Sequence, residues 1–254
     1  MPPAPNGHIL IFLNPAFKLR DALDLLVGDQ SACENYLYDQ QFAHPGYSGM
    51  IAQIANRPSL LVLQRTIAFE DLWPSNGDYD LNDLAVNYRV VAVLNAQNLA
   101  VQLDFLINVT SIRAAFTNGF GIEIETLVPS QIQSVTGNIL KHNYISQNAN
   151  GTEAGQQNAV IIIFDDPYEM RNNETRISVK LTTPLTTGKL GTAPFNPFLI
   201  IDKTREREVH LANMHTTDLG TKNFPINGVN RDEDGNYLND NGLPWAINIV
   251  HDFK

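Results

Sequence analysis

The stretch with the clearest chemical pattern is residues 70–83, which carry five carboxylates and two side-chain amides within fourteen residues. Such a cluster of like charges repels itself unless a cation or solvent relieves it. Calcium takes about six to eight oxygen ligands from carboxylates, amides and backbone carbonyls. Asp78, Asp80 and Asn82 alternate, so an irregular loop can turn all three toward one ion. We therefore predict a structural calcium site whose ligands are Glu70, Asp71, Asp78, Asp80, Asn82 and Asp83.

This stretch is not an EF-hand. If Asp78 is position one of the loop, position six is Asp83 instead of Gly, and position twelve is Arg89 instead of Glu. The alternative to a metal site is an Asx-rich turn in which the carboxylates accept hydrogen bonds from backbone N–H groups. Magnesium is less favoured than calcium, because a cage made only of protein oxygens suits the larger ion.

A second acidic stretch, from Asn230 to Asn241, is a weaker candidate for a metal site. Oxygen-bearing side chains stand at its positions one, three and five, and Gly235 stands at position six. Its twelfth position is Asn241, where an EF-hand has Glu. An exposed hairpin loop is the favoured interpretation.

The residues that suit catalysis form no recognisable motif. Glu123 and Glu125 share one face of an expected strand, and paired carboxylates serve glycoside hydrolysis, but a polar strand face explains them more simply. His210 and His215 are five residues apart, which fits no helical zinc pair and favours surface or hydrogen-bonded histidines. Cys33 is the single cysteine, which excludes an intrachain disulfide and a zinc cluster of cysteines. We therefore expect no enzyme.

The elements that must position these residues are mostly strands. Residues 99–109 alternate apolar and polar side chains over a full strand length, and polar, Asn- and Gly-rich connections separate consecutive strands. This order predicts a mainly β fold, an antiparallel β-sandwich of jelly-roll-like form with one or two short helices. One helix is expected over 18–27 and a helical turn near Ser130. The other strands are expected at 60–69, 84–94, 119–126, 159–164, 175–183, 196–201 and near 207–211.

The chain divides into two parts by this pattern. Residues 1–58 are expected to form an N-terminal segment packed on the main domain, and residues 59–254 the sandwich. The formal net charge of −10 makes a nucleic acid a poor partner. No apolar run reaches the roughly 18 residues that a membrane helix needs. The start of the chain has neither the basic nor the apolar region of a signal peptide, so we expect a cytoplasmic protein or one whose leader was removed.

Several motifs, in order, resemble one family. The sequence FEDLWP at 69–74 followed by GDYDLNDL at 77–84 is similar to the signature of LruC-domain proteins, and the likeness extends over about residues 66–250. These are bacterial surface or secreted proteins, many of them lipoproteins, with no established biochemical activity. The resemblance implies a β-rich extracellular domain. It is also carried by NGFGI at 118–122, SVTG at 134–137, NGTEAG at 150–155, FNPFLI at 195–200, EVHL at 208–211 and LPWAIN at 243–248.

Taken together, these observations predict a calcium-stabilised, non-catalytic β domain at the cell surface or outside the cell. Its expected role is that of a binding or adhesion module for an extracellular glycan or a surface protein. Aromatic residues such as Trp73, Tyr79, Tyr88 and Trp245 can line a groove for such a ligand, although strand aromatics more often fill the core. Two alternatives stay open, a carbohydrate-active enzyme and a purely architectural segment of a larger surface protein.

Overall fold

The computed structural model describes residues 60–171, 174–222 and 224–249. The expected N-terminal segment 1–58, with its helix at 18–27, therefore lies outside the described residues, and so does any boundary at residue 58. The described part confirms the mainly β fold and its two antiparallel sheets. The helical turn expected near Ser130 is a single 3₁₀ turn, η2 (Pro129–Gln131).

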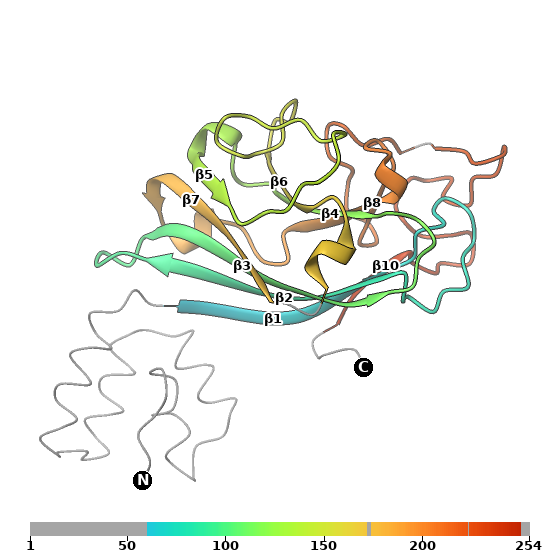
Figure 1. Cartoon of the computed structure of the whole chain (residues 1–254), viewed down its shortest axis with the longest axis horizontal. Helices are drawn as coiled ribbons and strands as arrows, with labels where there is room; N and C mark the ends of the chain where they lie inside the picture. Colours follow the sequence, from blue (N-terminus) through green and yellow to red (C-terminus); the bar gives the residue numbers. More distant parts are fainter. Residues whose placement is uncertain (1–59, 172–173, 223, 250–254) are drawn as a thin grey trace, which may run out of the picture.

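Within the described residues, ten strands form the two sheets, which lie face to face in Figure 1. The six-stranded sheet has the order β10-β1-β2-β3-β7-β5, and the four-stranded sheet the order β6-β4-β8-β9. Every strand pairing is antiparallel, as the consecutive strands in the sequence predict. The bounds are β1 (Leu60–Phe69), β2 (Leu84–Leu94), β3 (Ala100–Ile112), β4 (Gly119–Ile124), β5 (Ile132–Thr136), β6 (Ala159–Phe164), β7 (Thr175–Leu185), β8 (Asn196–Ile200), β9 (Glu208–His210) and β10 (Ala246–Ile249).

Short 3₁₀ turns complete the regular structure. They are η3 (Pro167–Met170), η4 (Thr187–Lys189) and η5 (Ile201–Lys203), in addition to η2. Asp166 caps η3, because its side chain accepts a hydrogen bond from the N–H of Tyr168 at 3.0 Å. In η5, Asp202 and Lys203 have positive φ angles, so this turn is a bend between β8 and β9.

The main core lies between the two sheets. Alternate residues of β3, such as Phe105 and Ile107, face Phe120 and Ile122 of β4 in one buried cluster. Removing these side chains from water is the main source of stability for such a sandwich. The alternation read in residues 99–109 therefore marks the core-facing positions correctly from Leu103 to Val109. At Val101 it is wrong, because a register shift between Ala100 and Gln102 leaves Val101 half-buried and places Ala100 in the core.

The outer face of the four-stranded sheet is buried as well. All six residues of β6 are buried, which agrees with its continuous apolar sequence AVIIIF. Val160, Ile162 and Phe198 form a second cluster on this face, and Tyr144 and Ile145 pack against it. Figure 1 shows the long connection between β5 and β6 on this side of the sheet, away from β1 and β2. The domain thus has a third layer made of loops.

Glycine in β4 makes room for this layer. Gly121 pairs directly with Phe198 of β8, and a Cβ at Gly121 would collide with the Phe198 ring. A Cβ at Gly119 would lie 2.6 Å from the Tyr144 hydroxyl. An aromatic ring over a strand glycine is a known way to fill the space that the missing side chain leaves.

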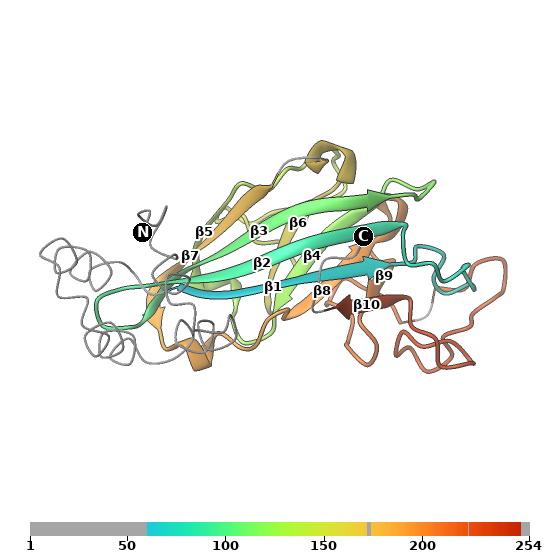
Figure 2. The same ribbon diagram turned by 90° about the horizontal axis from the view of Figure 1, so that it is seen from below.

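Two loops meet at one end of the sandwich. The first, residues 70–83, joins β1 to β2, and the second, residues 211–245, joins β9 to β10; Figure 2 shows both beyond the same end of the sheets. Backbone hydrogen bonds hold them together, from Glu70 N to Trp245 O and from Arg231 N to Pro74 O, each at 2.8 Å. The acidic loop is therefore packed against the C-terminal part of the fold.

Candidate functional site

The acidic loop wraps around the side chain of Glu70. This residue follows the last residue of β1 and is fully buried. Its carboxylate accepts hydrogen bonds from the backbone N–H groups of Leu81 at 2.5 Å and Tyr79 at 3.2 Å. Gly77 lies so close that a Cβ there would collide with a Glu70 oxygen. Tyr79 and Leu81 have φ angles of 56° and 54°, in the left-handed region, so the Glu70 contacts hold an unfavourable backbone conformation.

Three of the six predicted ligands meet around one point. Oxygen atoms of Glu70, Asp78 and Asp80 all lie within 4.8 Å of one another. Glu70 closes this group on the protein side, and Asp78 and Asp80 are exposed. Asn82 lies beside it, because its side-chain amide and its backbone N–H both donate to the Asp80 carboxylate. The alternation read in the sequence thus does bring these side chains to one side of the loop.

The other two predicted ligands face a different set of donors. Asp83 accepts a hydrogen bond from the backbone N–H of Asp71 at 2.9 Å. The Asp71 carboxylate, which is buried, accepts one from the side-chain amide of Asn118 at 2.8 Å. Asn118 in turn accepts from the backbone N–H of Asp202 at 3.1 Å. Asp83 thus holds Asp71 within the acidic loop, and Asp71 ties the loop through Asn118 to the start of β4 and to the turn after β8.

The environment of the acidic loop disfavours the ionised form of its two buried carboxylates, Glu70 and Asp71. Burial raises the pKa of Glu70 to about 7; the carboxylates of Asp83 and Asp78 add to this effect, and the Leu81 and Tyr79 N–H groups oppose it. Burial likewise raises the pKa of Asp71 to about 6, with Asp83 adding to the effect and Asn118 and Arg207 opposing it. A cation among these oxygens would favour their ionised forms.

In the second acidic stretch, the Asp232 carboxylate accepts hydrogen bonds that stabilise the loop. Asp232 is fully buried and accepts hydrogen bonds from the backbone N–H groups of Asn236 and Tyr237, each at 3.0 Å. It also accepts one from the indole N–H of Trp73 at 2.8 Å. Both carboxylate oxygens are thus engaged by N–H donors, which is the behaviour of an Asx-type loop.

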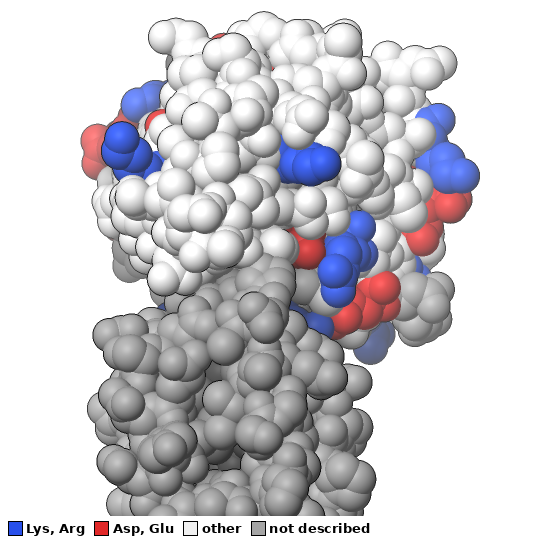
Figure 3. Space-filling model, turned by 90° about the vertical axis from the view of Figure 1, so that its left-hand side faces the viewer, with Lys and Arg blue, Asp and Glu red and all other residues white. Residues whose placement is uncertain are grey.

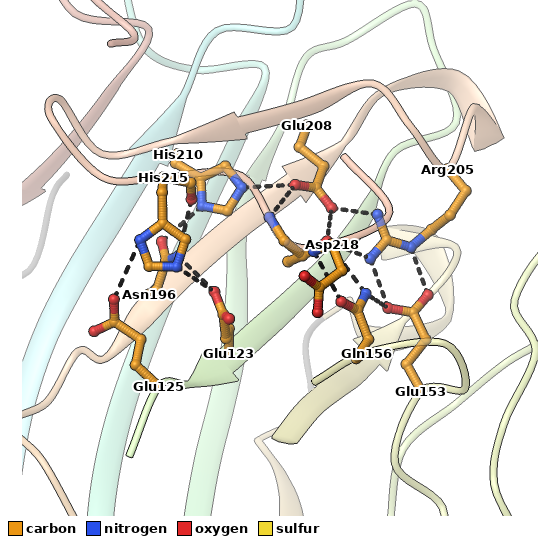
Figure 4. Close-up of polar contacts among 11 residues, drawn as sticks. Glu123, Glu125, Glu153, Gln156, Asn196, Arg205, Glu208, His210, His215 and Asp218 are labelled. Carbon is orange, nitrogen blue, oxygen red and sulfur yellow. Dashed lines mark hydrogen bonds and ion pairs between the residues drawn. The ribbon is translucent and has the colours of Figure 1, made fainter. Parts of the chain in front are cut away.

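A buried polar network lies on the outer face of the four-stranded sheet, and Figure 4 shows it. Asn196 at the start of β8 donates to the Glu123 carboxylate of β4 at 2.8 Å and to the backbone carbonyl of His215 at 3.0 Å. Its carbonyl oxygen pairs with a ring nitrogen of His210 on β9 at 2.6 Å. The other ring nitrogen of His210 pairs with Glu208 at 2.9 Å. Glu123, Asn196, Glu208 and His210 are at most 2% exposed.

The network continues through an arginine between two carboxylates. Arg205 pairs with Glu153 at 2.5 Å and 2.6 Å and also with Glu208. Burial alone would raise the pKa of Glu208, but His210, Arg205 and Thr217 together lower it to about 2. The same two carboxylates raise the pKa of Arg205 against the effect of its burial. Glu208 and Arg205 therefore stay ionised inside the protein.

His215 closes the network at the surface. It lies between Glu123 at 3.2 Å and Glu125 at 3.4 Å, and its side chain is 47% exposed. The interpretation of Glu123 as part of a solvated polar face is wrong, because Glu123 is only 2% exposed. One sequence pattern could have indicated the buried network: polar residues at outward positions of otherwise apolar strands, as in EVH at 208–210.

The comparisons with known proteins identify a family and leave its activity open. The model of a family described as "Domain of unknown function (DUF4842)" matches residues 98–254. A structure described as "Putative lipoprotein from Bacteroides ovatus" aligns with a TM-score of 0.48 and 13% sequence identity, over 75% of this chain and 65% of that chain.

Short matches also occur to two proteins described as "Probable inorganic carbon transporter subunit DabA". The one from Nitrosospira multiformis is 49% identical over 55 residues, which is 22% of this chain and 6% of that protein. The one from Azotobacter vinelandii is 50% identical over 50 residues, 20% of this chain and 6% of that protein. The chain thus spans a small fraction of the length of these relatives. The match over residues 98–254 covers more than half of the chain, which therefore belongs to the DUF4842 family.

Proposed function

We propose that this chain is a calcium-stabilised, non-catalytic β-sandwich module of a surface or secreted protein. The observation that carries the proposal is the meeting of the Glu70, Asp78 and Asp80 oxygens within 4.8 Å, at the junction of two loops. A calcium ion there would be held by these three carboxylates, and Asn82, which is hydrogen-bonded to Asp80, would contribute a further oxygen. Asp71 would support the loop through Asn118 instead of binding the ion.

The charge of the loop supports this proposal. Glu70 is buried next to other carboxylates, and the hydrogen bonds that its side chain accepts come from backbone N–H groups. A buried carboxylate without a positive partner costs several kcal/mol to ionise. Calcium would supply the positive charge and would favour the folded loop by mass action.

In this proposal the calcium ion keeps the two loops at this end of the sandwich in one conformation, so that they form a contact surface. The loop at 70–83 and the loop at 211–245 each carry an exposed apolar side chain, Leu72 at 41% and Leu243 at 45%. Through them the module would meet an extracellular glycan or a surface protein. On the face shown in Figure 3, the described residues carry few charged side chains, with both signs near each other. That face therefore lacks the basic patch typical of nucleic-acid binding. In the described part of the chain, no helix is long and apolar enough to cross a membrane.

A thermal melt of metal-stripped protein, with and without millimolar calcium, tests the proposal. At a calcium concentration about 100 times the Kd, binding stabilises the folded state by about 2.7 kcal/mol. For a domain of this size, that corresponds to a rise in Tm of roughly 5–10 °C. The variant Asp78→Asn/Asp80→Asn should lose this rise, because it removes two of the three carboxylates that meet.

A matched control separates the two acidic stretches. The variant Glu233→Asn/Asp234→Asn also removes two exposed carboxylates, but from the loop around Asp232. It should keep the full calcium-dependent rise in Tm. If the control loses the calcium-dependent rise in Tm and the first variant keeps it, the ion binds in the second loop. No calcium-dependent change in the unaltered protein would refute the proposal.

A further inference from the structure

The buried network places a hydroxyl against a carboxamide. Thr217, in the loop after β9, and Gln156, in the loop before β6, are 3% and 9% exposed. The Nε2–H of Gln156 donates a hydrogen bond to the Oγ1 of Thr217 at 3.2 Å. A hydroxyl held against an amide in a dry environment is the starting arrangement for acyl transfer, provided that a base, an oxyanion donor and a place for the leaving nitrogen are present.

Glu208 is placed as the base. The hydroxyl of Thr217 donates to the Oε1 of Glu208 at 2.6 Å, and the backbone N–H of Thr217 donates to its Oε2 at 2.9 Å. His210 holds the same Oε2 at 2.9 Å and therefore acts as a positioning residue. An N–H of Arg205 also lies 3.1 Å from the Oγ1 of Thr217, where it would stabilise negative charge on that oxygen. Glu208 thus fulfils the geometric requirement for a general base.

The carboxamide of Gln156 is held at both of its ends. The backbone N–H of Asp218 donates to the Oε1 of Gln156 at 3.0 Å, so a donor already points at the oxygen on which negative charge would develop. The Nε2 of Gln156 donates to the carboxylate of Glu153 at 2.7 Å. These two contacts fix which end of the amide is oxygen. Figure 4 shows Gln156 between Glu153 and Asp218, beside Arg205 and Glu208.

We propose that Thr217 and Gln156 form an intramolecular ester in this protein. The Oγ1 of Thr217 attacks the Cδ of Gln156 while its proton passes to Glu208. The tetrahedral oxygen is stabilised by the N–H of Asp218. The C–N bond then breaks, the nitrogen takes the proton back from Glu208, and ammonia leaves. One O–C bond and one N–H bond replace one O–H bond and one C–N bond, so atoms and charge balance without an oxidant or a co-reactant.

The distance to be closed is small. The Cδ of Gln156 is one C–N bond of about 1.33 Å from Nε2, so it lies within about 4.5 Å of the Thr217 hydroxyl oxygen. Attack requires about 3–3.5 Å, so the Thr217 oxygen and the amide carbon must approach each other by about 1 Å while the Asp218 N–H keeps its contact with Oε1. The reaction happens once in the life of the chain, so even a weakly basic carboxylate suffices. Release of ammonia from a buried site makes the step irreversible in practice.

The ester would fasten the loop layer of the fold. Gln156 belongs to the long connection between β5 and β6 and Thr217 to the loop after β9, and 61 positions separate them in the chain. A covalent bond between them closes that length of chain into a ring, as a disulfide does. A chain with a single cysteine has no intrachain disulfide for this purpose.

Intact mass spectrometry of the purified full chain tests the proposal. The protein should be lighter than its sequence by one ammonia. Trypsin should release residues 142–171 and 208–222 as one joined peptide, and fragmentation should place the bond at Gln156 and Thr217. A succinimide at an Asn-Gly pair such as Asn150-Gly151 also removes one ammonia, but it joins no peptides. A loss confined to such a site would overturn the proposal.

Three variants complete the experiment. Thr217→Val removes the hydroxyl and should show the full sequence mass, and Thr217→Ser keeps it and should again lose one ammonia. Glu208→Gln should slow the loss of ammonia at least tenfold after synthesis. Thermal melts establish which variants fold. The decisive measurement needs no variant, because folded, unaltered protein that keeps its full mass after prolonged incubation would overturn the proposal.

Discussion

The indole N–H of Trp73 donates a hydrogen bond to Asp232 at 2.8 Å, across 159 positions of the chain. Both side chains are fully buried. Trp73 lies in the acidic loop and Asp232 in the second acidic stretch, so this one bond joins the two regions of the sequence that look most suited to metal binding. Tyr237 packs against Trp73 on one side, with ring centroids 5.6 Å apart, and against His210 on the other at 5.2 Å. The acidic loop, the C-terminal loop and the buried network therefore share one packed interior.

Asp232→Ala should reduce the free energy of unfolding by about 3 kcal/mol or more, because it leaves two buried N–H donors and one half-buried N–H donor without their acceptor. Trp73→Phe removes one of these bonds but keeps most of the ring, and should cost about half as much. Urea unfolding followed by circular dichroism measures both values. If Asp232→Ala changes the free energy by less than about 1 kcal/mol, the buried carboxylate is not what holds the loops together.

The stability of metal-free protein should fall as the pH rises from about 4.5 to 7. Burial raises the pKa of Glu70 from an ordinary 4.5 to about 7, so in this window the folded chain keeps a proton that the unfolded chain has released. The loss of stability is on the order of 2–3 kcal/mol and is complete above pH 7. Asp71, whose pKa burial raises to about 6, contributes only at the lower end. The decrease in the free energy of unfolding between pH 6 and 7 therefore comes mainly from Glu70.

Glu70→Gln should flatten this slope relative to the unaltered protein, and the exposed-site control Glu206→Gln should leave it unchanged. Calcium prefers the ionised carboxylate, so its apparent affinity should rise with pH up to about 7. Urea unfolding at half-unit pH steps, with a chelator or with calcium, gives both results. Equal slopes in the unaltered protein and in Glu70→Gln would show that Glu70 does not carry the titration.

The sequence allows the sheet fold to be predicted well. A strand with one face on the core alternates apolar and polar residues, and residues 99–109 show this alternation. It also allows the meeting of Glu70, Asp78 and Asp80 to be predicted, since these residues lie within one loop. The network around Glu208 could not be predicted, because Glu123, Glu153, Asn196 and Thr217 meet only through the pairing order of the four-stranded sheet and two long loops. A pattern in a single strand carries no information about which strand or loop will lie opposite it.

Gly121→Ala should destabilise the domain by about 1–3 kcal/mol, since the new methyl group would meet the buried Phe198 ring. A thermal melt should show a drop in Tm of roughly 2–10 °C. Gly188→Ala is the matched control, because nothing lies within 4 Å of a Cβ at that position. Its Tm should stay the same or rise slightly. Equal effects of the two substitutions would mean that the Phe198 ring does not need the space over β4.

Asn196→Asp should destabilise the domain by about 3 kcal/mol or more at neutral pH, because it replaces the amide that donates to Glu123 at 2.8 Å with a second buried carboxylate. The loss should shrink as the pH falls, since a protonated Asp at this position can again donate to Glu123. Asn158→Asp is the matched control. Asn158 donates to the other oxygen of Glu123 at 2.8 Å but is less buried, so solvent should reduce the penalty there. Urea unfolding of both variants at pH 7.5 and pH 5 compares them. A penalty at residue 196 that is independent of pH, or smaller than that at residue 158, would show that charge repulsion at Glu123 is not its cause.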